Sequence, residues 1–172
     1  MIKRRETFAI ATILAGFSLP AAAQGVCGSM LMPAAQLKQV SRGLSRGHAG
    51  LDLTAPYGSP VRAAFGGEVV FAGSYYGYGN MVDLRHPDGS VTRYGHLSAY
   101  APGLREGMLV ETGAPLGRVG TSGQAHGAHL HFEVRIGGRA VDPKPFLTLA
   151  NCPASMRPAI EEARAPERPT SR

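Results

Sequence analysis

The sequence predicts an all-β fold, a compact domain built on a mostly antiparallel sheet. Between about residues 43 and 149, short runs of strand-forming residues are separated by Gly, Pro and Asn. Helical periodicity is nearly absent over the same stretch. Many short strands joined by Gly-rich turns are typical of antiparallel sheets.

Residues 1–23 have the three-part layout of a secretory signal peptide. Basic residues at positions 3–5 precede an apolar run at residues 8–19, and Ala21, Ala22 and Ala23 form a small-residue cleavage site. The apolar run is too short for an ordinary membrane span. We therefore expect cleavage after Ala23 and a periplasmic or secreted protein without a stable membrane anchor. The export route stays open, because paired arginines also occur in twin-arginine signals.

Beyond the signal peptide, the chain is long enough for one domain with a core and too short for two. We expect an N-terminal segment at residues 24–42, one folded domain at residues 43–149 and a flexible tail at residues 150–172. The tail is rich in Pro, Ala, Glu and Arg, which gives it little to bury. It has room for one short helix at residues 160–164.

The two cysteines, Cys27 and Cys152, flank the predicted domain. In an oxidising compartment, such a pair is typically joined in a disulfide, which here would tie the ends of the domain together. Two separate buried thiols are the alternative. Val26 precedes Cys27 where a lipoprotein signal would have a small residue, which argues against a lipid anchor.

The formal net charge of the chain is +6 at pH 7. A modest positive charge on an exported protein suits an anionic polymer such as a cell wall, although solvated surface residues alone give the same excess. The sequence has no basic clusters interleaved with aromatic residues, so it gives no support for nucleic-acid binding.

Within the domain, the strand patterns follow one another in order. A buried strand begins at Leu51, where two leucines flank Asp52, and "HPDGS" at residues 86–90 is a turn between two strands. Further strands are predicted at residues 67–75, 80–86, 90–97, 108–113, 116–120 and 129–138.

The last of these strands, "HLHFEVRIGG", alternates polar and apolar side chains. Alternate residues of a strand share a face. One face therefore carries Leu130, Phe132 and Val134, and the other carries His129, His131 and Glu133. A half-buried strand whose polar face meets water is the ordinary interpretation, so this pattern alone does not establish a site.

A second candidate pair is His48 and Asp52. Four residues of straight strand span about 13 Å, whereas zinc binds nitrogen and oxygen ligands at roughly 2.0–2.2 Å. Both side chains reach one ion only if the chain bends between them, and Gly50 provides the conformational freedom for a bend. Imidazoles with a carboxylate favour zinc. Four ligands would make a structural site, and three would leave one position open for water.

Over about residues 46–147 the chain resembles the lysostaphin-like, or LytM-type, zinc metallopeptidases, which cut peptide bonds in bacterial peptidoglycan. Four segments carry the resemblance in order, namely "HAGLDLTAPYGSPVRAAFGGEVVFAG", "VTRYGHLS", "GAHLHFEVR" and "AVDPKPFL". The resemblance implies the duplicated hybrid, barrel-sandwich-like sheet of that family, with residues 43–149 as the metallopeptidase domain.

The resemblance also assigns roles to single residues. His48, Asp52 and His131 match the family's ligands to one zinc ion, and His96 and His129 match its catalytic histidines. Three protein ligands leave a position for water, whose pKa zinc lowers. A neutral imidazole can take the proton of that water, and a protonated one can stabilise the oxyanion or the leaving amine. Which histidine is the general base stays open.

The remaining candidates have simpler interpretations. We expect His86 to be structural, His126 and Asp142 to belong to turns, and Tyr94 to pack in the core. Glu133 shares a face with the histidines, but the implied ligand set is complete without it. A hydrogen bond to a ligand is therefore its expected role.

The function implied is that of an exported, monomeric zinc endopeptidase acting on the peptide stems of peptidoglycan. Family members cut either polyglycine bridges or D-alanyl-diaminopimelate cross-links. A short chain without a recognisable wall-targeting domain favours the second bond by analogy. The alternative is a non-catalytic domain of the same type that binds cell wall or activates another hydrolase. Such domains can lose metal ligands, and this chain keeps all three.

Overall fold

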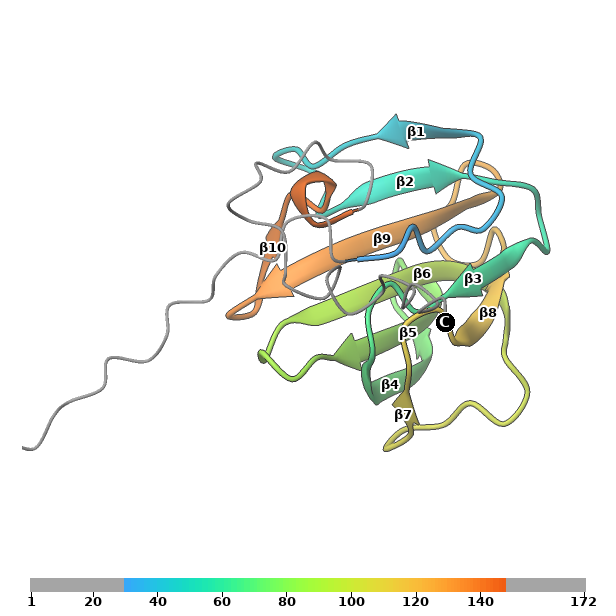
Figure 1. The fold of residues 1–172 in the computed structure, drawn as a ribbon. Helices are drawn as coiled ribbons and strands as arrows, with labels where there is room; N and C mark the ends of the chain where they lie inside the picture. Colours follow the sequence, from blue (N-terminus) through green and yellow to red (C-terminus); the bar gives the residue numbers. More distant parts are fainter. Residues whose placement is uncertain (1–29, 148–172) are drawn as a thin grey trace, which may run out of the picture.

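The computed structural model describes residues 30–147. The predicted signal peptide, both cysteines with their predicted disulfide, and the predicted tail lie outside these residues. Within them, the chain forms one antiparallel sheet system, shown in Figure 1. The all-β prediction is confirmed. Among residues 30–147, no helix has the length and apolar character that crossing a membrane requires.

The sheet is built on a path in the order β1-β2-β9-β6-β5-β4-β7, and all strand pairs are antiparallel. Off this path, β10 pairs with β9, and β8 pairs with both β3 and β6. Within residues 30–147, the strands and a short 3-10 helix are β1 (Gln39–Arg42), β2 (Leu51–Thr54), β3 (Pro60–Arg62), β4 (Gly67–Tyr75), β5 (Gly79–Arg85), β6 (Val91–Tyr100), β7 (Leu109–Val110), β8 (Pro115–Val119), β9 (His129–Ile136), β10 (Arg139–Val141) and η1 (Lys144–Phe146).

The longer strands lie where the alternating patterns predict them. The predicted strand at residues 67–75 coincides with β4, and β9 begins at the predicted residue. The predicted strand at residues 108–113 is reduced to the two residues of β7. The short strands β1, β3 and β10 were not predicted. Every residue of β1 is exposed, so it has no apolar alternation to detect.

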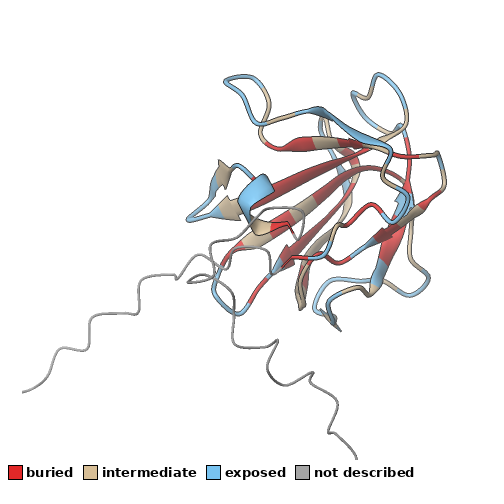
Figure 2. Ribbon diagram, turned by 45° about the horizontal axis from the view of Figure 1, so that its top comes forward, coloured by how far each residue is buried: buried red, intermediate tan, exposed pale blue. Residues whose placement is uncertain are grey.

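The core lies along the central strands, where Figure 2 shows the buried residues. The apolar face of β9 is part of it, because Leu130, Phe132 and Val134 are all fully buried. Full burial of one such side chain contributes about 1.5–3 kcal/mol. The ring of Phe132 packs against that of Tyr94, with centroids 5.4 Å apart.

The opposite face of β9 is buried as well. His131 is 5% exposed and Glu133 is fully buried. The interpretation of "HLHFEV" as a half-buried strand with a water-facing polar side is therefore wrong. Buried polar side chains require hydrogen-bonding partners, so this face is a polar cluster inside the protein.

His86 lies in a second buried polar group within the core. Its Nδ1–H donates to the Gly66 carbonyl at 2.9 Å, and its Nε2 lies 2.9 Å from the Thr92 hydroxyl. That hydroxyl lies 2.9 Å from the Tyr94 hydroxyl, which accepts the backbone N–H of Ala64 at 2.8 Å. His86 is therefore structural, as predicted, and Tyr94 adds a hydrogen bond to its packing.

The two ends of the described chain lie side by side. Met30 and Leu147 form a parallel β-bridge, and the Met30 N–H donates to the Phe146 carbonyl at 2.9 Å. The side chains of Met30 and Leu147 both belong to the core. The domain is thus closed by contact between its first and last described residues.

Candidate metal centre

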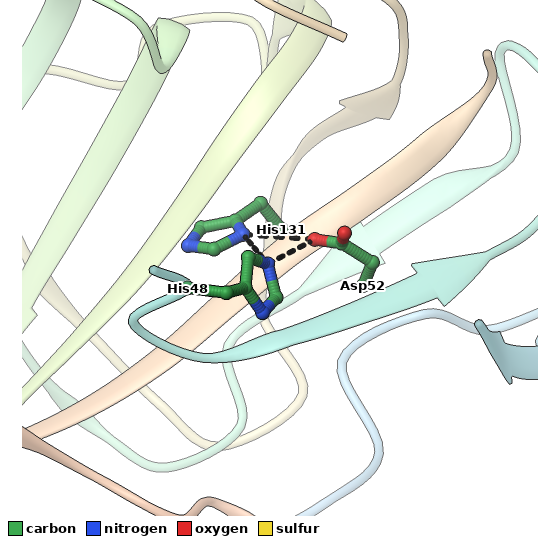
Figure 3. A group of neighbouring side chains, drawn as sticks. All are labelled: His48, Asp52 and His131. Carbon is green, nitrogen blue, oxygen red and sulfur yellow. Dashed lines mark hydrogen bonds and ion pairs between the residues drawn. The ribbon is translucent and has the colours of Figure 1, made fainter. Parts of the chain in front are cut away.

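Two neighbouring strands and the turn before them bring His48, Asp52 and His131 together. Asp52 on β2 is the cross-strand partner of His131 on β9, so their side chains share one face of the sheet. His131 Nδ1 lies 2.9 Å from Asp52 Oδ1. His48 Nε2 lies 2.9 Å from the same oxygen and 3.1 Å from His131 Nδ1. Figure 3 shows the three atoms pointing toward one common centre.

A tight turn provides the bend that joins His48 to Asp52. The backbones of Ser45 and His48 exchange hydrogen bonds of 3.0 and 3.1 Å across the turn. Gly50 then passes so close to β9 that a Cβ atom on it would collide with the Phe132 carbonyl oxygen. The predicted bend is present, but Gly50 is needed for this close approach rather than for an unusual φ angle.

Both candidate histidine ligands have an oxygen acceptor on the side of the ring away from Asp52. A carbonyl oxygen can only accept, so His48 Nδ1–H donates to the Gly43 carbonyl at 2.9 Å. His131 is oriented the other way round, with Nε2 lying 3.0 Å from Glu133 Oε1. When the far nitrogen of each ring keeps its proton, the nitrogen that faces Asp52 is the one available to a metal ion.

Three atoms that can ligate a metal ion thus lie close to one another. Burial alone would raise the pKa of Asp52, yet hydrogen bonds with His131 and His48 outweigh burial and lower that pKa to about 2. Asp52 is accordingly a carboxylate at neutral pH. Burial would lower the pKa of His131, but hydrogen bonds to Asp52 and Glu133 raise it. Two imidazole nitrogens and a carboxylate oxygen about 3 Å apart need positive charge among them, which either ring protons or a metal ion supplies. Zinc, with ligand distances of roughly 2.0–2.2 Å, fits this set of donors.

Glu133 contacts His131 on the side of the ring that faces away from Asp52. It accepts hydrogen bonds from His131 Nε2 at 3.0 Å and the Tyr78 hydroxyl at 2.6 Å, and it pairs with the Arg135 guanidinium. Burial would raise the pKa of Glu133, but these bonds lower it to about 2. The ionised carboxylate therefore holds His131 by Nε2, the arrangement seen around histidines that ligate metals. Tyr78 was missed in the sequence, where nothing distinguishes it from its tyrosine neighbours.

His96 and His129 lie beside this cluster. Their ring centroids are 4.7 Å apart, and His129 Nε2 lies 3.5 Å from Asp52 Oδ1. His96 Nδ1–H donates to the Ser122 carbonyl at 2.8 Å, and His129 Nδ1–H donates to the Gly127 carbonyl at 2.9 Å. In each neutral ring, Nε2 is therefore the basic nitrogen. Both rings have the tautomer that a proton acceptor needs.

The backbone of His96 has an uncommon conformation. Its φ angle is 60°, the only positive value outside glycine among the residues that the structure describes. Val82 pairs with Tyr94 and Asn80 with Leu97, so β6 has one residue more than β5 over this stretch. His96 thus lies in a β-bulge, a feature that often re-aims a side chain next to an active site. Backbone strain of this kind also concentrates at functional sites.

The five residues open onto one cleft of about 960 Å³. His126 also lines this cleft from an exposed position in the loop before β9. His86 does not contribute to the cleft. The cleft further includes two arginines that the sequence analysis did not single out, Arg42 and Arg46.

The chain is similar in sequence to a known peptidase family and to named bacterial relatives. The model of the family described as Peptidase family M23 matches residues 46–143. Over 96 residues, the chain is 47% identical to the "DD-carboxypeptidase/endopeptidase Mpg" of Neisseria meningitidis serogroup B. That alignment covers 56% of this chain and 22% of the Neisseria protein, so the chain spans about a fifth of that relative.

Solved structures show the same fold. The catalytic domain of the antimicrobial peptidase lysostaphin from Staphylococcus simulans superposes with a TM-score of 0.54 and 33% identity, over 64% of this chain and 86% of that domain. A zinc-containing peptidase from Vibrio cholerae superposes with a TM-score of 0.61 and 28% identity, over 74% of this chain and 41% of that one. The resemblance to lysostaphin-like peptidases is confirmed.

Proposed function

The chain belongs to peptidase family M23, and from this premise we propose that it is an exported zinc endopeptidase that hydrolyses peptide cross-links of bacterial peptidoglycan. The bond we propose is D-alanyl-diaminopimelate. The relative from Neisseria is named for DD bonds, which join residues of D configuration, and such residues characterise wall peptides. A periplasmic location follows from this substrate and from the signal-like residues 1–23.

The observation that carries this proposal is the convergence of three side-chain atoms that can ligate a metal ion. His48 Nε2, His131 Nδ1 and Asp52 Oδ1 lie 2.9–3.1 Å from one another. The other ring nitrogen of each histidine lies 2.9–3.0 Å from an oxygen acceptor, the Gly43 carbonyl for His48 and the Glu133 carboxylate for His131. The nitrogen and oxygen donors suit zinc, and the structural relative from Vibrio cholerae is a zinc-containing peptidase.

Zinc held by these three residues would polarise the scissile carbonyl and lower the pKa of the attacking water. His96 and His129 act as the general base and the general acid. One neutral ring accepts the proton of the water at Nε2, and one protonated ring donates to the oxyanion or to the leaving amine. Their two backbone acceptors, the carbonyls of Ser122 and Gly127, keep Nε2 available for this exchange.

The same residues favour an enzyme over a non-catalytic wall-binding domain. A domain that only binds or activates has no need for an intact ligand set or for two histidines at the rim of the cluster. Here all five side chains are present and line one cleft. Asp52, His96, His129 and His131 lie on the paired strands β2, β6 and β9, and His48 lies in the turn before β2.

The test is digestion of purified peptidoglycan by the chain without residues 1–23, with products identified by mass. We expect cross-linked muropeptide dimers to be converted into monomers whose masses show hydrolysis of the D-alanyl-diaminopimelate bond. We also expect a zinc chelator to stop the reaction and added zinc to restore it. Intact dimers after digestion with the zinc-loaded protein would contradict the proposed function.

A further inference from the structure

The edge strand β1 places a basic side chain beside the candidate metal ligands. Arg42 on β1 is the cross-strand partner of Asp52 on β2, and Asp52 is the partner of His131 on β9. Residues directly opposite one another on paired strands share a face, with Cβ atoms about 4.5–5.5 Å apart. Arg42, Asp52 and His131 therefore form one row across the sheet.

A β-bulge sets this alignment. Val40 pairs with Leu53 and Arg42 with Asp52, so Ser41 is an extra residue on β1. The Ser41 hydroxyl donates to the Asp52 carbonyl at 3.2 Å, which holds the bulge against β2. In a regular ladder, Ser41 would face Asp52 and Arg42 would point to the other side of the sheet. The bulge thus brings Arg42 to the cleft.

The charge of the cleft wall is one-sided. Arg42 and Arg46 both line the cleft, and Asp52 is the only carboxylate among the described residues that line it. Within residues 30–147, neither arginine takes part in an ion pair. By contrast, Arg85, Arg93 and Arg135 each pair with a carboxylate elsewhere in the sheet. The cleft therefore presents unpaired guanidinium groups to whatever enters it.

The proposed substrate carries a matching group next to the reacting bond. In a D-alanyl-diaminopimelate cross-link, the carbon bonded to the scissile nitrogen retains a free carboxylate. A stem that ends in D-alanyl-D-alanine has the same group, on its terminal residue. In a polyglycine bridge, the corresponding carboxyl is consumed in the next peptide bond. Three covalent bonds of about 1.3–1.5 Å separate the reacting carbonyl carbon from this carboxylate.

We propose that Arg42 binds the free carboxylate on the carbon attached to the scissile nitrogen. A guanidinium group recognises a carboxylate through two parallel N–H···O bonds. Arg42 is the cross-strand partner of Asp52 and lines the same cleft, so this long side chain is the basic group we assign to a carboxylate three bonds from a carbonyl at the metal centre. This inference rests on the proposed function and specifies its substrate class.

A consequence is that one residue serves two reactions. Endopeptidase cleavage of a cross-link and carboxypeptidase cleavage of a terminal D-alanine both present the same carboxylate in the same place. The chain should therefore cut both kinds of bond and discriminate against polyglycine. Arg46 lies at the turn between Ser45 and His48, outside the row of ligands, and contributes general positive charge rather than this contact.

The test uses two pairs of matched substrates and the zinc-loaded protein. One pair is a cross-linked muropeptide dimer, and the other is a stem pentapeptide ending in D-alanyl-D-alanine. Each is prepared with the carboxylate in question free or converted to its amide. The variants are Arg42→Gln, Arg42→Lys and Arg46→Gln, with Arg62→Gln as a control on an exposed arginine of β3 that does not line the cleft.

We expect the unmodified protein to favour each free acid over its amide by roughly 10- to 100-fold in kcat/KM, mainly through KM. Arg42→Gln should lower kcat/KM for the acids to the level of the amides and leave the amides unchanged. Arg42→Lys should recover part of the preference, because it keeps the charge and loses the paired geometry. Zinc content and melting temperature should be the same in every variant, and Arg62→Gln should behave as the unmodified protein.

Equal cleavage of acid and amide by the unmodified protein would overturn the inference while leaving the proposed function intact. So would an Arg42→Gln variant that loses activity equally on acids and amides, or a loss of preference in Arg46→Gln alone. Preference for the acid in the dimer but not in the pentapeptide would restrict the contact to cross-links and refute the shared role. If the zinc-loaded protein cleaved none of the four substrates, that result would contradict the proposed function itself.

Discussion

His48 Nε2 and His131 Nδ1 lie 3.1 Å apart, although each ring directs its proton-bearing nitrogen away from the other. With Asp52 Oδ1 they form a group of three atoms that can ligate one metal ion. The partners that impose it are the Gly43 carbonyl and the Glu133 carboxylate, which come from outside the ligand set. The candidate metal site therefore depends on residues that are not among its three ligands.

The first prediction concerns Glu133. Glu133→Ala removes the acceptor that orients His131, so zinc affinity should fall by roughly 10- to 100-fold, the usual effect of losing such a partner. Competition for zinc with a chromophoric chelator measures it, on protein shown to be folded by circular dichroism. Glu133→Gln keeps one acceptor oxygen and should fall less. Tyr78→Phe, which removes one hydrogen bond from Glu133 but keeps its carboxylate, is the matched control. Equal zinc affinity in the unmodified protein and the three variants would refute the role of Glu133.

A second prediction concerns acid stability. Burial lowers the pKa of His86 below 6.5 despite its hydrogen bond to Gly66, so below pH 6.5 the unfolded chain binds a proton that the folded chain resists. The contribution of His86 to stability is therefore complete above pH 6.5 and declines as pH falls below it, with a slope of up to about 1.4 kcal/mol per pH unit. Urea unfolding between pH 5 and 8 measures this slope.

His86→Gln provides the comparison for that titration. The variant lacks the titrating group, so its free energy of unfolding should change less between pH 7 and pH 5 than that of the unmodified protein. The difference in slope matters, since the substitution also alters stability at neutral pH. Identical slopes in the two proteins would show that His86 is protonated equally well when folded.

A third prediction uses two glycines on either side of His48. A Cβ atom at Gly50 would collide with the Phe132 carbonyl, whereas a Cβ atom at Gly47 would meet nothing within 4 Å. Gly50→Ala should therefore destabilise the domain by about 1–3 kcal/mol, and Gly47→Ala should change stability by less than about 0.5 kcal/mol. Thermal melting of the two variants compares them directly. Similar melting temperatures would mean that β2 can move away from β9 without loss.

The fourth prediction is the disulfide between Cys27 and Cys152, which lie outside the described residues. Cys27 is three residues before Met30, and Cys152 is five residues after Leu147, whose backbones form a bridge. A bond that closes so long a loop stabilises by roughly 4–5 kcal/mol at most. Thiol titration of denatured, unreduced protein isolated from the periplasm should find no free thiols. Two thiols per chain would exclude the bond.

Much of the sheet could be predicted from the sequence, because the strands that build the core alternate apolar and polar residues. Leu130, Phe132 and Val134 mark β9 in this way, and all three are buried. The exposed strand β1 has no such alternation, so it was missed along with Arg42. Its place in the sheet depends on pairing with β2 across a bulge, which no local pattern encodes.

The site could be predicted in part for a similar reason. The resemblance to a family supplied His48, Asp52 and His131, and the structure brings these three together. The resemblance could not supply the acceptors that fix each ring, because the carbonyls of Gly43, Ser122 and Gly127 are brought to the histidines by folding. Nor could it supply the positive φ angle of His96, which follows from the extra residue in β6.

The two histidines of "HLH" provide the most direct test of the proposed site. His131 lies within 2.9–3.1 Å of the other two ligand atoms, and His129 Nε2 lies 3.5 Å from Asp52 Oδ1. The measurement is zinc content per chain by elemental analysis, together with muropeptide turnover, for His129→Ala and His131→Ala. We predict that His131→Ala loses both zinc and turnover, and that His129→Ala keeps one zinc per chain and loses most of its turnover. Loss of zinc from His129→Ala as complete as from His131→Ala would contradict the separation of ligand and catalytic histidine.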